Sequence, residues 1–203
     1  KAFHQLYFNS KVADNNTFFF GVPILKNPLD LWIFQEIIYE VRPDVIIETG
    51  THKGGSALYY AYLCDRLGNG RIITADIQDW GPLPKHKRIT YLRGSAIAPK
   101  ITGKIAKMIK PAEKVLVFLD DDHTAKHVLQ ELRTYGKFVT KGSYMICEDT
   151  MLGGQPVKPE YGDPGPMKAV ELFLQENRDF MIDKSRQKFY FSFNYSGYLK
   201  KVR

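Results

Sequence analysis

Acidic side chains gather in two short stretches of the sequence. Asp120–Asp122 stand in a row before His123, and Glu148 and Asp149 form a second acidic pair. Five carboxylates held close together repel one another unless a cation screens their charge. Carboxylate oxygens are the usual ligands of hard divalent ions such as Mg²⁺, whereas Zn²⁺ favours histidine and cysteine. The sequence therefore predicts a divalent-metal site, in which one of the three aspartates caps the helix that opens at Thr124 instead of binding metal.

His123 directly follows this acidic run, where a histidine can act as a general base. Nearby carboxylates raise the pKa of an imidazole and a bound metal lowers it, so the ring could accept a proton near neutral pH. The alternative is that His123 caps or packs without touching a substrate. His52, in a glycine-bearing turn, is a second candidate for contact with ligand or substrate.

The segment Glu48-Thr-Gly-Thr-His-Lys-Gly-Gly-Ser56 combines a carboxylate with a tight glycine turn. Gly50 and Gly54 let the backbone approach a ligand, and the helix that begins near Ser56 offers free backbone N–H groups. The segment lacks the sequence patterns of phosphate-binding loops. Glu48 would repel a phosphate, but it suits a cationic amino group.

Asp76, at the end of the next predicted strand, is placed to accept hydrogen bonds from two ribose hydroxyls. S-adenosylmethionine carries an amino acid at one end and a nucleoside at the other, so it matches both Glu48 and Asp76. The structural alternative is that Glu48 caps a helix and Asp76 closes a turn. Because the two residues follow successive strands, we favour the cofactor.

Strands and helices alternate along most of the chain. Continuous apolar runs predict strands over 44–48, 71–76, 89–93, 115–120 and 144–148. Helical spacing predicts helices over 28–42, 55–67, 99–109, 124–135 and 167–176, and the end of the chain predicts a β-hairpin over 180–183 and 189–195. This order indicates an α/β, Rossmann-like fold with a doubly wound, mostly parallel sheet and an antiparallel C-terminal hairpin. Ligands of such sheets bind beyond the carboxyl ends of the strands, where the acidic residues are expected.

The length of 203 residues suits one domain, and 44% hydrophobic with 25% charged residues is ordinary for a globular protein. We expect a single domain over 1–203, with an irregular aromatic arm over 1–28 and the Rossmann-like core over 29–203. The chain does not begin with methionine, as expected of a domain excised from a longer polypeptide. No membrane-spanning run and no signal peptide is visible, so a cytoplasmic location is expected.

Several motifs together resemble one family, the cephalosporin hydroxylase/rhamnosyl O-methyltransferase family of metal-dependent class I methyltransferases. The resemblance covers nearly the whole chain and rests on Lys26-Asn-Pro-Leu-Asp-Leu-Trp32, Glu48 to Ser56, Asp120-Asp-Asp-His123, Gly142-Ser-Tyr144, Glu148-Asp-Thr150 and Gly165-Pro-Met167. It implies a seven-stranded sheet that binds S-adenosylmethionine over its first two strands and Mg²⁺ or Mn²⁺ beyond the fourth and fifth. The candidate cofactor-binding residues are Glu48, Gly50, Thr51, His52, Gly54, Ser56, Asp76, Ile77, Ser95 and Asp120.

The metal ligands implied by the resemblance are Glu148, Asp149 and one aspartate of the preceding run. Alignment on the strand end favours Asp120, whereas loop spacing favours Asp122. The more distantly similar catechol-type O-methyltransferases have a lysine base three residues after their metal-binding aspartate. This chain has His123 three residues after Asp120. The catalytic candidates are therefore His123 and Asp122, and a catechol acceptor is disfavoured.

The resulting hypothesis is methyl transfer from S-adenosylmethionine to a sugar hydroxyl, on rhamnose or a similar deoxysugar of a glycan. Vicinal sugar oxygens suit a bound metal. An antibiotic, polyketide or phenolic hydroxyl is the alternative acceptor. The net charge of +7 also leaves a non-catalytic nucleic-acid-binding module, although a cleft with five carboxylates would repel phosphates. A loop over 153–166 should cover the acceptor, with Tyr161 and the N-terminal aromatic residues as walls, and the sequence is compatible with a homo-oligomer.

Overall fold

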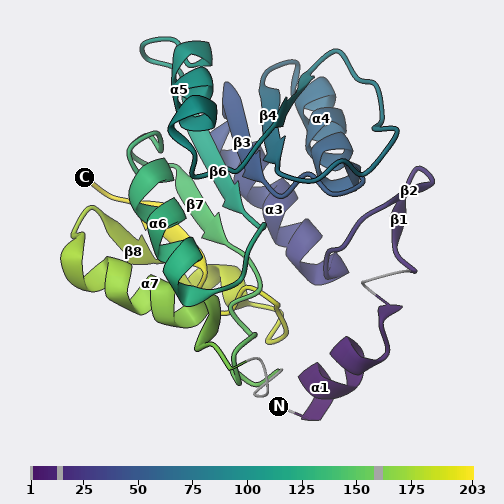
Figure 1. The fold of residues 1–203 in the computed structure, drawn as a ribbon, viewed down its shortest axis with the longest axis vertical. Helices are drawn as coiled ribbons and strands as arrows, with labels where there is room; N and C mark the ends of the chain where they lie inside the picture. The colour runs from purple at the N-terminus through teal and green to yellow at the C-terminus, as the bar shows by residue number, and fades with distance from the viewer. Residues whose placement is uncertain (1, 13–15, 158–161) are drawn as a thin grey trace.

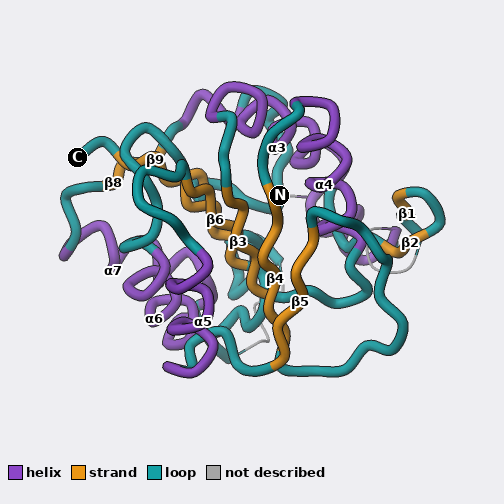
Figure 2. The backbone as a smooth tube through the Cα atoms, turned by 90° about the horizontal axis from the view of Figure 1, so that it is seen from above, coloured by secondary structure: helices purple, strands orange, loops and turns teal. Residues whose placement is uncertain are grey.

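The computed structural model describes residues 2–12, 16–157 and 162–203, and within these ranges seven strands form one mixed sheet (Figure 1, Figure 2). In chain order the strands are β3 (Val45–Thr49), β4 (Arg71–Asp76), β5 (Ile89–Arg93), β6 (Val115–Leu119), β7 (Tyr144–Cys147), β8 (Phe180–Ile182) and β9 (Tyr198–Lys201). Across the sheet their order is β5-β4-β3-β6-β7-β9-β8, with β9 antiparallel to both neighbours and the first five strands parallel. The predicted Rossmann-like fold is confirmed.

Helices cover both faces of this sheet (Figure 1). One face carries α3 (Pro28–Val41) and α4 (Gly55–Leu67), and the other carries α5 (Pro99–Met108), α6 (Ala125–Tyr135) and α7 (Gly165–Glu176). In β6, Leu116 and Phe118 enter the core under α3 and α4, while Val117 enters the core under α6 and α7. Burial on both faces explains why the central strands are continuously apolar instead of alternating.

The strand order reverses at the centre of the sheet. After β3 the chain adds β4 and β5 on one side, and then returns to add β6 and β7 on the other side. The loops that follow β3 and β6 therefore diverge beyond the carboxyl ends of these strands. Such a reversal opens the crevice in which ligands of doubly wound sheets bind.

The N-terminal arm, expected to be irregular, contains helix α1 (Ala2–Asn9) and a short hairpin of β1 (Phe18–Phe19) and β2 (Val22–Pro23). No side chain of α1 is fully buried, so the helix leaves no apolar period in the sequence. Aromatic contacts hold the hairpin to α4, with the ring of Phe19 edge-on to Tyr59 at 5.2 Å and to Tyr62 at 5.7 Å. Among the described residues, no helix combines the length and the apolar character needed to cross a bilayer.

The predicted position of the last strand is wrong, because 189–195 forms a loop and β9 begins only at Tyr198. This loop follows β8 and a 3₁₀ helix, η2 (Lys184–Gln187). The buried carboxylate of Asp30 in α3 holds the loop by accepting hydrogen bonds from Ser192 Oγ (2.6 Å), the Phe193 N–H (2.8 Å) and Tyr198 OH (2.7 Å). The alternating aromatic residues that suggested a strand pack elsewhere, since Phe193 lies edge-on to Tyr7 of α1.

Candidate functional site

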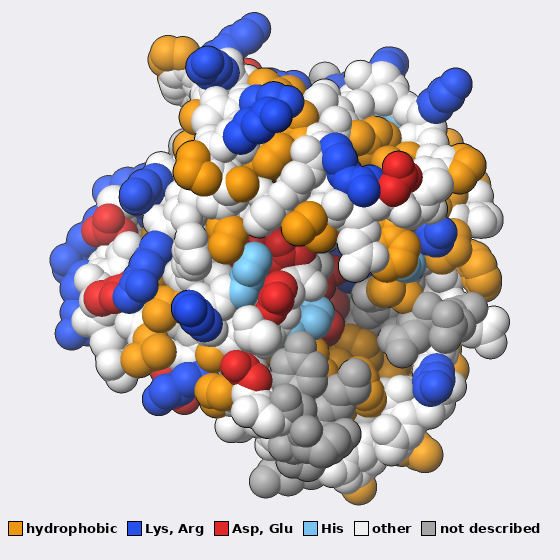
Figure 3. All heavy atoms as spheres, viewed as in Figure 1, with side chains coloured by type: hydrophobic (Ala, Val, Ile, Leu, Met, Phe, Trp, Pro, Cys, Tyr) orange, Lys and Arg blue, Asp and Glu red, His pale blue; other side chains and the backbone are white. Residues whose placement is uncertain are grey.

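A cavity of about 810 Å³ lies at the carboxyl ends of the parallel strands. The loops after β3, β4, β5, β6 and β7 line it, together with Phe8 and residues 23–26 of the arm and Phe193 of the C-terminal loop. Figure 3 shows acidic and histidine side chains inside a hollow on this face of the molecule. The volume falls in the range of about 300–1,000 Å³ that is usual for small-molecule sites.

Most of the predicted site residues line this cavity. They are Gly50, Thr51, His52, Ser56, Asp76, Ile77, Ser95, Asp120, Asp122, His123 and Asp149. Glu48, Gly54 and Glu148 are not part of the lining, and both glutamates are buried. The structure therefore brings the residues from five separate loops to one place, with two carboxylates beneath its floor. Tyr161 lies outside the described residues.

The turn between β3 and α4 requires glycine. Gly50 has φ +83°, and a Cβ added to it would lie 1.9 Å from the carbonyl oxygen of Asp120. Gly54 is the N-cap of α4 with φ +79°, and no side chain caps this helix. The first N–H groups of α4 are therefore left without side-chain partners beside Ser56, which suits an electronegative group of a ligand.

Glu48 lies beneath the cavity floor, with only 1% of its surface exposed. Its Oε2 accepts a hydrogen bond from Thr74 Oγ1 at 2.6 Å, and Thr74 Oγ1 in turn lies 2.6 Å from Thr51 Oγ1. Burial raises the pKa of Glu48 to about 7, while Lys26 opposes this rise. The carboxyl thus belongs to a buried network that supports the glycine turn, and its predicted contact with a cofactor amino group stays a prediction.

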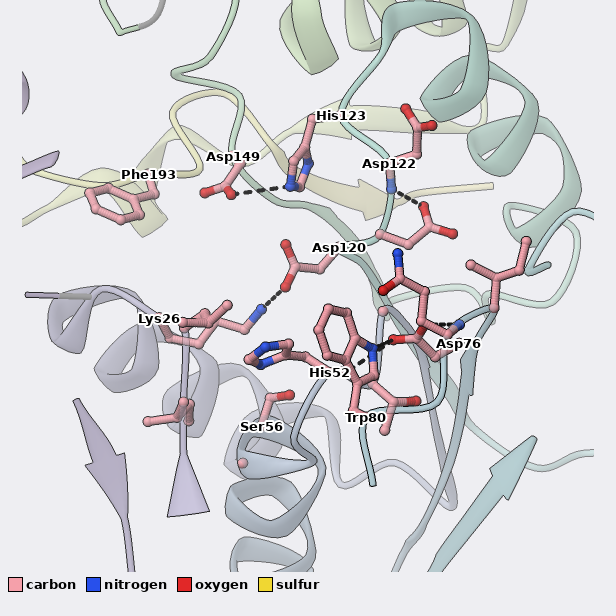
Figure 4. A pocket seen from close by; sticks show the side chains of 18 of the residues that line it. Lys26, His52, Ser56, Asp76, Trp80, Asp120, Asp122, His123, Asp149 and Phe193 are labelled. Carbon is pink, nitrogen blue, oxygen red and sulfur yellow. Dashed lines mark hydrogen bonds and ion pairs between the residues drawn. The ribbon is translucent and has the colours of Figure 1, made fainter. Parts of the chain in front are cut away.

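Asp76 stands at the opposite end of the cavity (Figure 4). Its Oδ2 accepts from the His52 N–H and from Trp80 Nε1, each at 2.9 Å, and its Oδ1 accepts from the Gln78 N–H at 2.7 Å. The rings of His52 and Trp80 meet edge-on at 4.5 Å, and burial lowers the pKa of His52. Ile77, whose side chain is exposed, adds an apolar surface beside this carboxylate. The sequence analysis did not identify Trp80, because it lies in a loop where no sequence pattern marks it.

The loops after β6 and β7 bring three candidate metal ligands or bases together. Asp120, His123 and Asp149 each offer one ligand atom within 4.8 Å of the others, and His123 Nε2 lies 3.5 Å from Asp149 Oδ2. Asp149 has a left-handed backbone conformation, φ +53°, and its N–H donates to Asn194 Oδ1 at 2.9 Å. Desolvation raises the pKa of Asp149 to about 6, with His123 opposing the rise. Strained residues held in this way are frequent at functional sites.

The other two aspartates of the run have different partners. Asp122 Oδ1 accepts from the N–H of Thr124, the residue before α6, at 2.8 Å. The first N–H of α6, that of Ala125, donates instead to Asp163 Oδ1 at 2.7 Å, so in the described part of the chain the expected capping role falls to Asp163 and not to an aspartate of the run. Asp121 faces His127 of α6, with Oδ1 and Nε2 3.2 Å apart. The hydrogen bond to Asp121 raises the pKa of His127, a residue that the sequence did not single out. Of the two alternatives for the first metal ligand, this geometry favours Asp120.

Lys26 is a further residue of this region that the sequence analysis did not single out. Its side chain is 4% exposed, its ammonium pairs with the Asp120 carboxylate, and its Nζ lies 3.0 Å from Glu148 Oε2. Figure 4 shows it entering from the arm, opposite the loop after β6. Burial by itself lowers the pKa of Lys26, but Asp120, Glu148 and Glu48 outweigh that effect and raise it. The only available signal was its place at the start of the motif Lys26–Trp32.

Comparison with known proteins identifies the family and the fold of this chain. The family model described as rhamnosyl O-methyltransferase/CmcI matches residues 11–202. The rhamnosyl O-methyltransferase of Mycobacterium leprae (strain TN) is 34% identical over 97% of this chain and 88% of its own length, and that of Mycobacterium tuberculosis (strain ATCC 25618 / H37Rv) is 31% identical over 91% and 77%. Among solved structures, that of CmcI-D160 with Mg and SAM has a TM-score of 0.70 at 21% identity, covering 92% of this chain and 77% of CmcI, and it shares the fold. The family resemblance expected from the sequence motifs is confirmed, and the chain belongs to the rhamnosyl O-methyltransferase/CmcI family.

Proposed function

We propose that this protein transfers the methyl group of S-adenosylmethionine to a hydroxyl group of rhamnose or a similar deoxysugar of a glycan, in a reaction that depends on a divalent metal. The mycobacterial relatives named rhamnosyl O-methyltransferase support both the reaction and the acceptor. One observation carries the proposal. A single cavity joins an end built around Asp76 to a carboxylate-rich end built around Asp120 and Asp149.

The residues at the carboxylate-rich end fit a magnesium or manganese ion. Asp120, Glu148 and Asp149 would hold it, because carboxylate oxygens are the preferred ligands of these ions. Glu148 is 3% exposed, and its Oε1 has no hydrogen-bond partner among the described residues. A buried carboxylate oxygen without a partner is costly unless a cation or another donor satisfies it. This oxygen supports the metal site, and the magnesium complex of CmcI agrees with it.

The opposite end fits S-adenosylmethionine. Asp76 would accept the ribose hydroxyls, and the exposed side chain of Ile77 would pack against the adenine ring. The uncapped start of α4 beside Ser56 would bind the carboxylate of the methionyl part. Thr51, His52 and Ser95 complete this end of the cavity. The donor would then lie with its methyl group directed toward Asp120 and His123.

His123 is the proposed base. Its Nε2 is aimed into the cavity beside Asp149, so it can take the proton of the acceptor hydroxyl, and the carboxylate would stabilise the resulting imidazolium. Asp122 would serve the reaction indirectly, since its bond to the Thr124 N–H holds the loop that carries His123. When bound, the metal ion would supply Lewis-acid polarisation of the acceptor oxygens. The remaining contribution is alignment of the reacting atoms, an effect worth up to about 7–11 kcal/mol.

Apolar side chains surround the space left for the acceptor. Phe8 and Leu25 come from the N-terminal arm, Met151 and Leu152 follow β7, and Phe193 comes from the C-terminal loop. Such walls suit the methyl group of a 6-deoxysugar better than the hydroxymethyl group of an ordinary hexose, because an apolar wall leaves a buried hydroxyl without a partner. Because Phe8 and Leu25 belong to the arm, we propose that the arm, 1–28, forms part of the acceptor wall. Residues 1–203 would then act as one methyltransferase domain.

A direct test uses methyl-labelled S-adenosylmethionine, Mg²⁺ and three acceptors that share one phenolic aglycone: its rhamnoside, its glucoside and the free phenol. We expect label on the rhamnoside, less on the glucoside, and none in the presence of a chelator. Label on the free phenol alone would overturn the sugar acceptor but keep the methyltransferase. Transfer that persists unchanged in the chelator would overturn the metal requirement.

A further inference from the structure

The ammonium of Lys26 is an unusually placed charged group. Lysine is among the residues least often buried, yet its side chain here is 4% exposed and reaches across the ends of two neighbouring strands. Its partners are Asp120, just after β6, and Glu148, just after β7. Capping of the helix that follows does not need Lys26, because Asn27 already accepts from the Leu29 N–H at 3.1 Å and Pro28 opens α3.

The partners of Lys26 are two of the three proposed metal ligands. A divalent ion bound by Asp120, Glu148 and Asp149 would use the same carboxylates that now surround the ammonium. Two cations that share the same pair of carboxylates repel each other strongly in a buried site. The ammonium and the metal ion therefore compete for these oxygens.

The ammonium also has a role without the metal. Asp120 and Glu148 directly follow the adjacent parallel strands β6 and β7, and Glu48 lies on β3, the neighbour of β6 on its other side. All three carboxylates act electrostatically on Lys26. Removing one partner of a buried ion pair is destabilising because the other charge is left uncompensated.

We propose that Lys26 is the internal counter-ion of the metal-free site: it bridges Asp120 and Glu148 when no metal is bound, and it lowers the affinity of the site for the metal. The inference rests on the proposed function only through the assignment of these carboxylates as metal ligands. Lys26 is not a catalytic residue in this account. It sets how tightly the metal is held and how stable the protein is without it.

The test compares wild-type protein with Lys26→Met by titration with Mn²⁺ alone. The concentration of free Mn²⁺ is measured by electron paramagnetic resonance. We expect Lys26→Met to bind Mn²⁺ at least about tenfold more tightly, because a neighbouring positive charge has been removed. In a chelator its melting temperature should fall below that of the wild type, and added Mn²⁺ should restore more stability to it than to the wild type. The matched control is Lys201→Met, since among the residues that the structure describes Lys201 Nζ donates to two carbonyl oxygens, those of Gly136 and Val139, at 3.1 and 2.9 Å.

Should Lys26→Met not fold even with Mn²⁺, Lys26→Gln takes its place with the same expectations, because its amide can still donate to both carboxylates without carrying charge. A variant that is less stable in the chelator but binds Mn²⁺ with wild-type or weaker affinity would overturn the counter-ion role while leaving the metal site intact. Absence of Mn²⁺ binding in wild type and variants would overturn the metal site, and with it both the proposed metal dependence and this inference.

Discussion

Asp76 and Glu148 illustrate how single carboxylates of similar chemistry receive different tasks from their surroundings. Asp76 faces the cavity, and both of its oxygens accept from N–H donors of its own and neighbouring loops. Glu148 lies below the floor, and burial raises its pKa well above the usual range while Lys26 opposes the rise. Hydrogen bonds hold the first carboxylate at the cavity wall, where we propose that it binds a hydroxyl-bearing ligand. The second is buried where only a cation can compensate its charge.

The first prediction follows from the position of Asp76. Replacing it by alanine should weaken S-adenosylmethionine binding by about 10- to 100-fold, the effect of losing hydrogen bonds to a charged acceptor. Metal binding should stay unchanged. Calorimetric titration of both ligands measures this, with Asp79→Ala as control because the Asp79 side chain is 76% exposed and outside the cavity. Equal cofactor affinity of wild type and Asp76→Ala would remove Asp76 from the cofactor site.

A second prediction concerns His123. The variant His123→Ala should lower turnover by about 10²- to 10⁴-fold, the usual contribution of a general base, while both ligand affinities change little. His86→Ala is the matched control, because the His86 imidazole pairs with Asp65 at 3.0 Å outside the cavity. Steady-state turnover with saturating acceptor provides the measurement. Turnover of His123→Ala equal to that of the wild type would show that another group accepts the proton.

Among the elements, the buried parallel strands were predictable from the sequence alone. β6 is buried on both faces at every residue, so its sequence Val-Leu-Val-Phe-Leu carries an unambiguous apolar signal. The acidic residues after β6 and β7 could be placed at one rim, because parallel strands that share a sheet end at the same edge. This reasoning places the carboxylate-rich end of the cavity from the sequence alone.

What escaped prediction depends on contacts between segments far apart in the chain. Lys26 is buried only because the arm crosses the strand ends, 94 residues before its partner Asp120. The loop over 189–195 has the alternation of a strand, but it is drawn away from the sheet by Asp30, which lies more than 160 residues earlier. Local sequence patterns indicate whether a segment favours a strand or a helix. They do not indicate which distant residues the segment contacts in the folded chain.

A prediction at this scale concerns the connection from α5 to β6. Glu113 receives two hydrogen bonds from Arg71, the first residue of β4, at 2.7 and 2.8 Å, and one from the Lys110 N–H at 2.7 Å. These hydrogen bonds lower the pKa of Glu113 from 4.5 to about 2, and the bonds from Arg71 have the largest effect. Because the folded state binds the proton less readily, the stabilisation is complete above pH 4.5 and is lost as the pH falls toward 2.

The variant Glu113→Gln should therefore be less stable than the wild type by about 1 kcal/mol at neutral pH, since the pair is partly exposed to solvent. The difference should shrink as the pH falls below 4.5. Urea unfolding at several pH values measures it, with Glu171→Gln as control because Glu171 makes a single exposed contact, 3.4 Å, with Lys168. A stability difference that does not vary with pH would contradict the ion-pair explanation.

The whole molecule combines a net charge of +7 with an acidic cavity. In Figure 3 the Lys and Arg side chains are spread over the visible face, whereas acidic groups and histidines occupy the hollow. An acidic cleft disfavours nucleic-acid binding in the cavity, because phosphates would meet carboxylates there. It favours ligands that bring positive charge, such as a metal ion and the sulfonium of S-adenosylmethionine.

The most direct test of the account is anomalous diffraction from crystals soaked with Mn²⁺ and S-adenosylhomocysteine. The account predicts one strong anomalous peak about 2.1 Å from carboxylate oxygens of Asp120, Glu148 and Asp149, with the nucleoside against Asp76. It also predicts that Lys26 Nζ moves away from at least one of its two carboxylate partners. Crystals that bind S-adenosylhomocysteine but show no peak among these three carboxylates would contradict the central claim that this protein works with a metal ion at the end of β6 and β7.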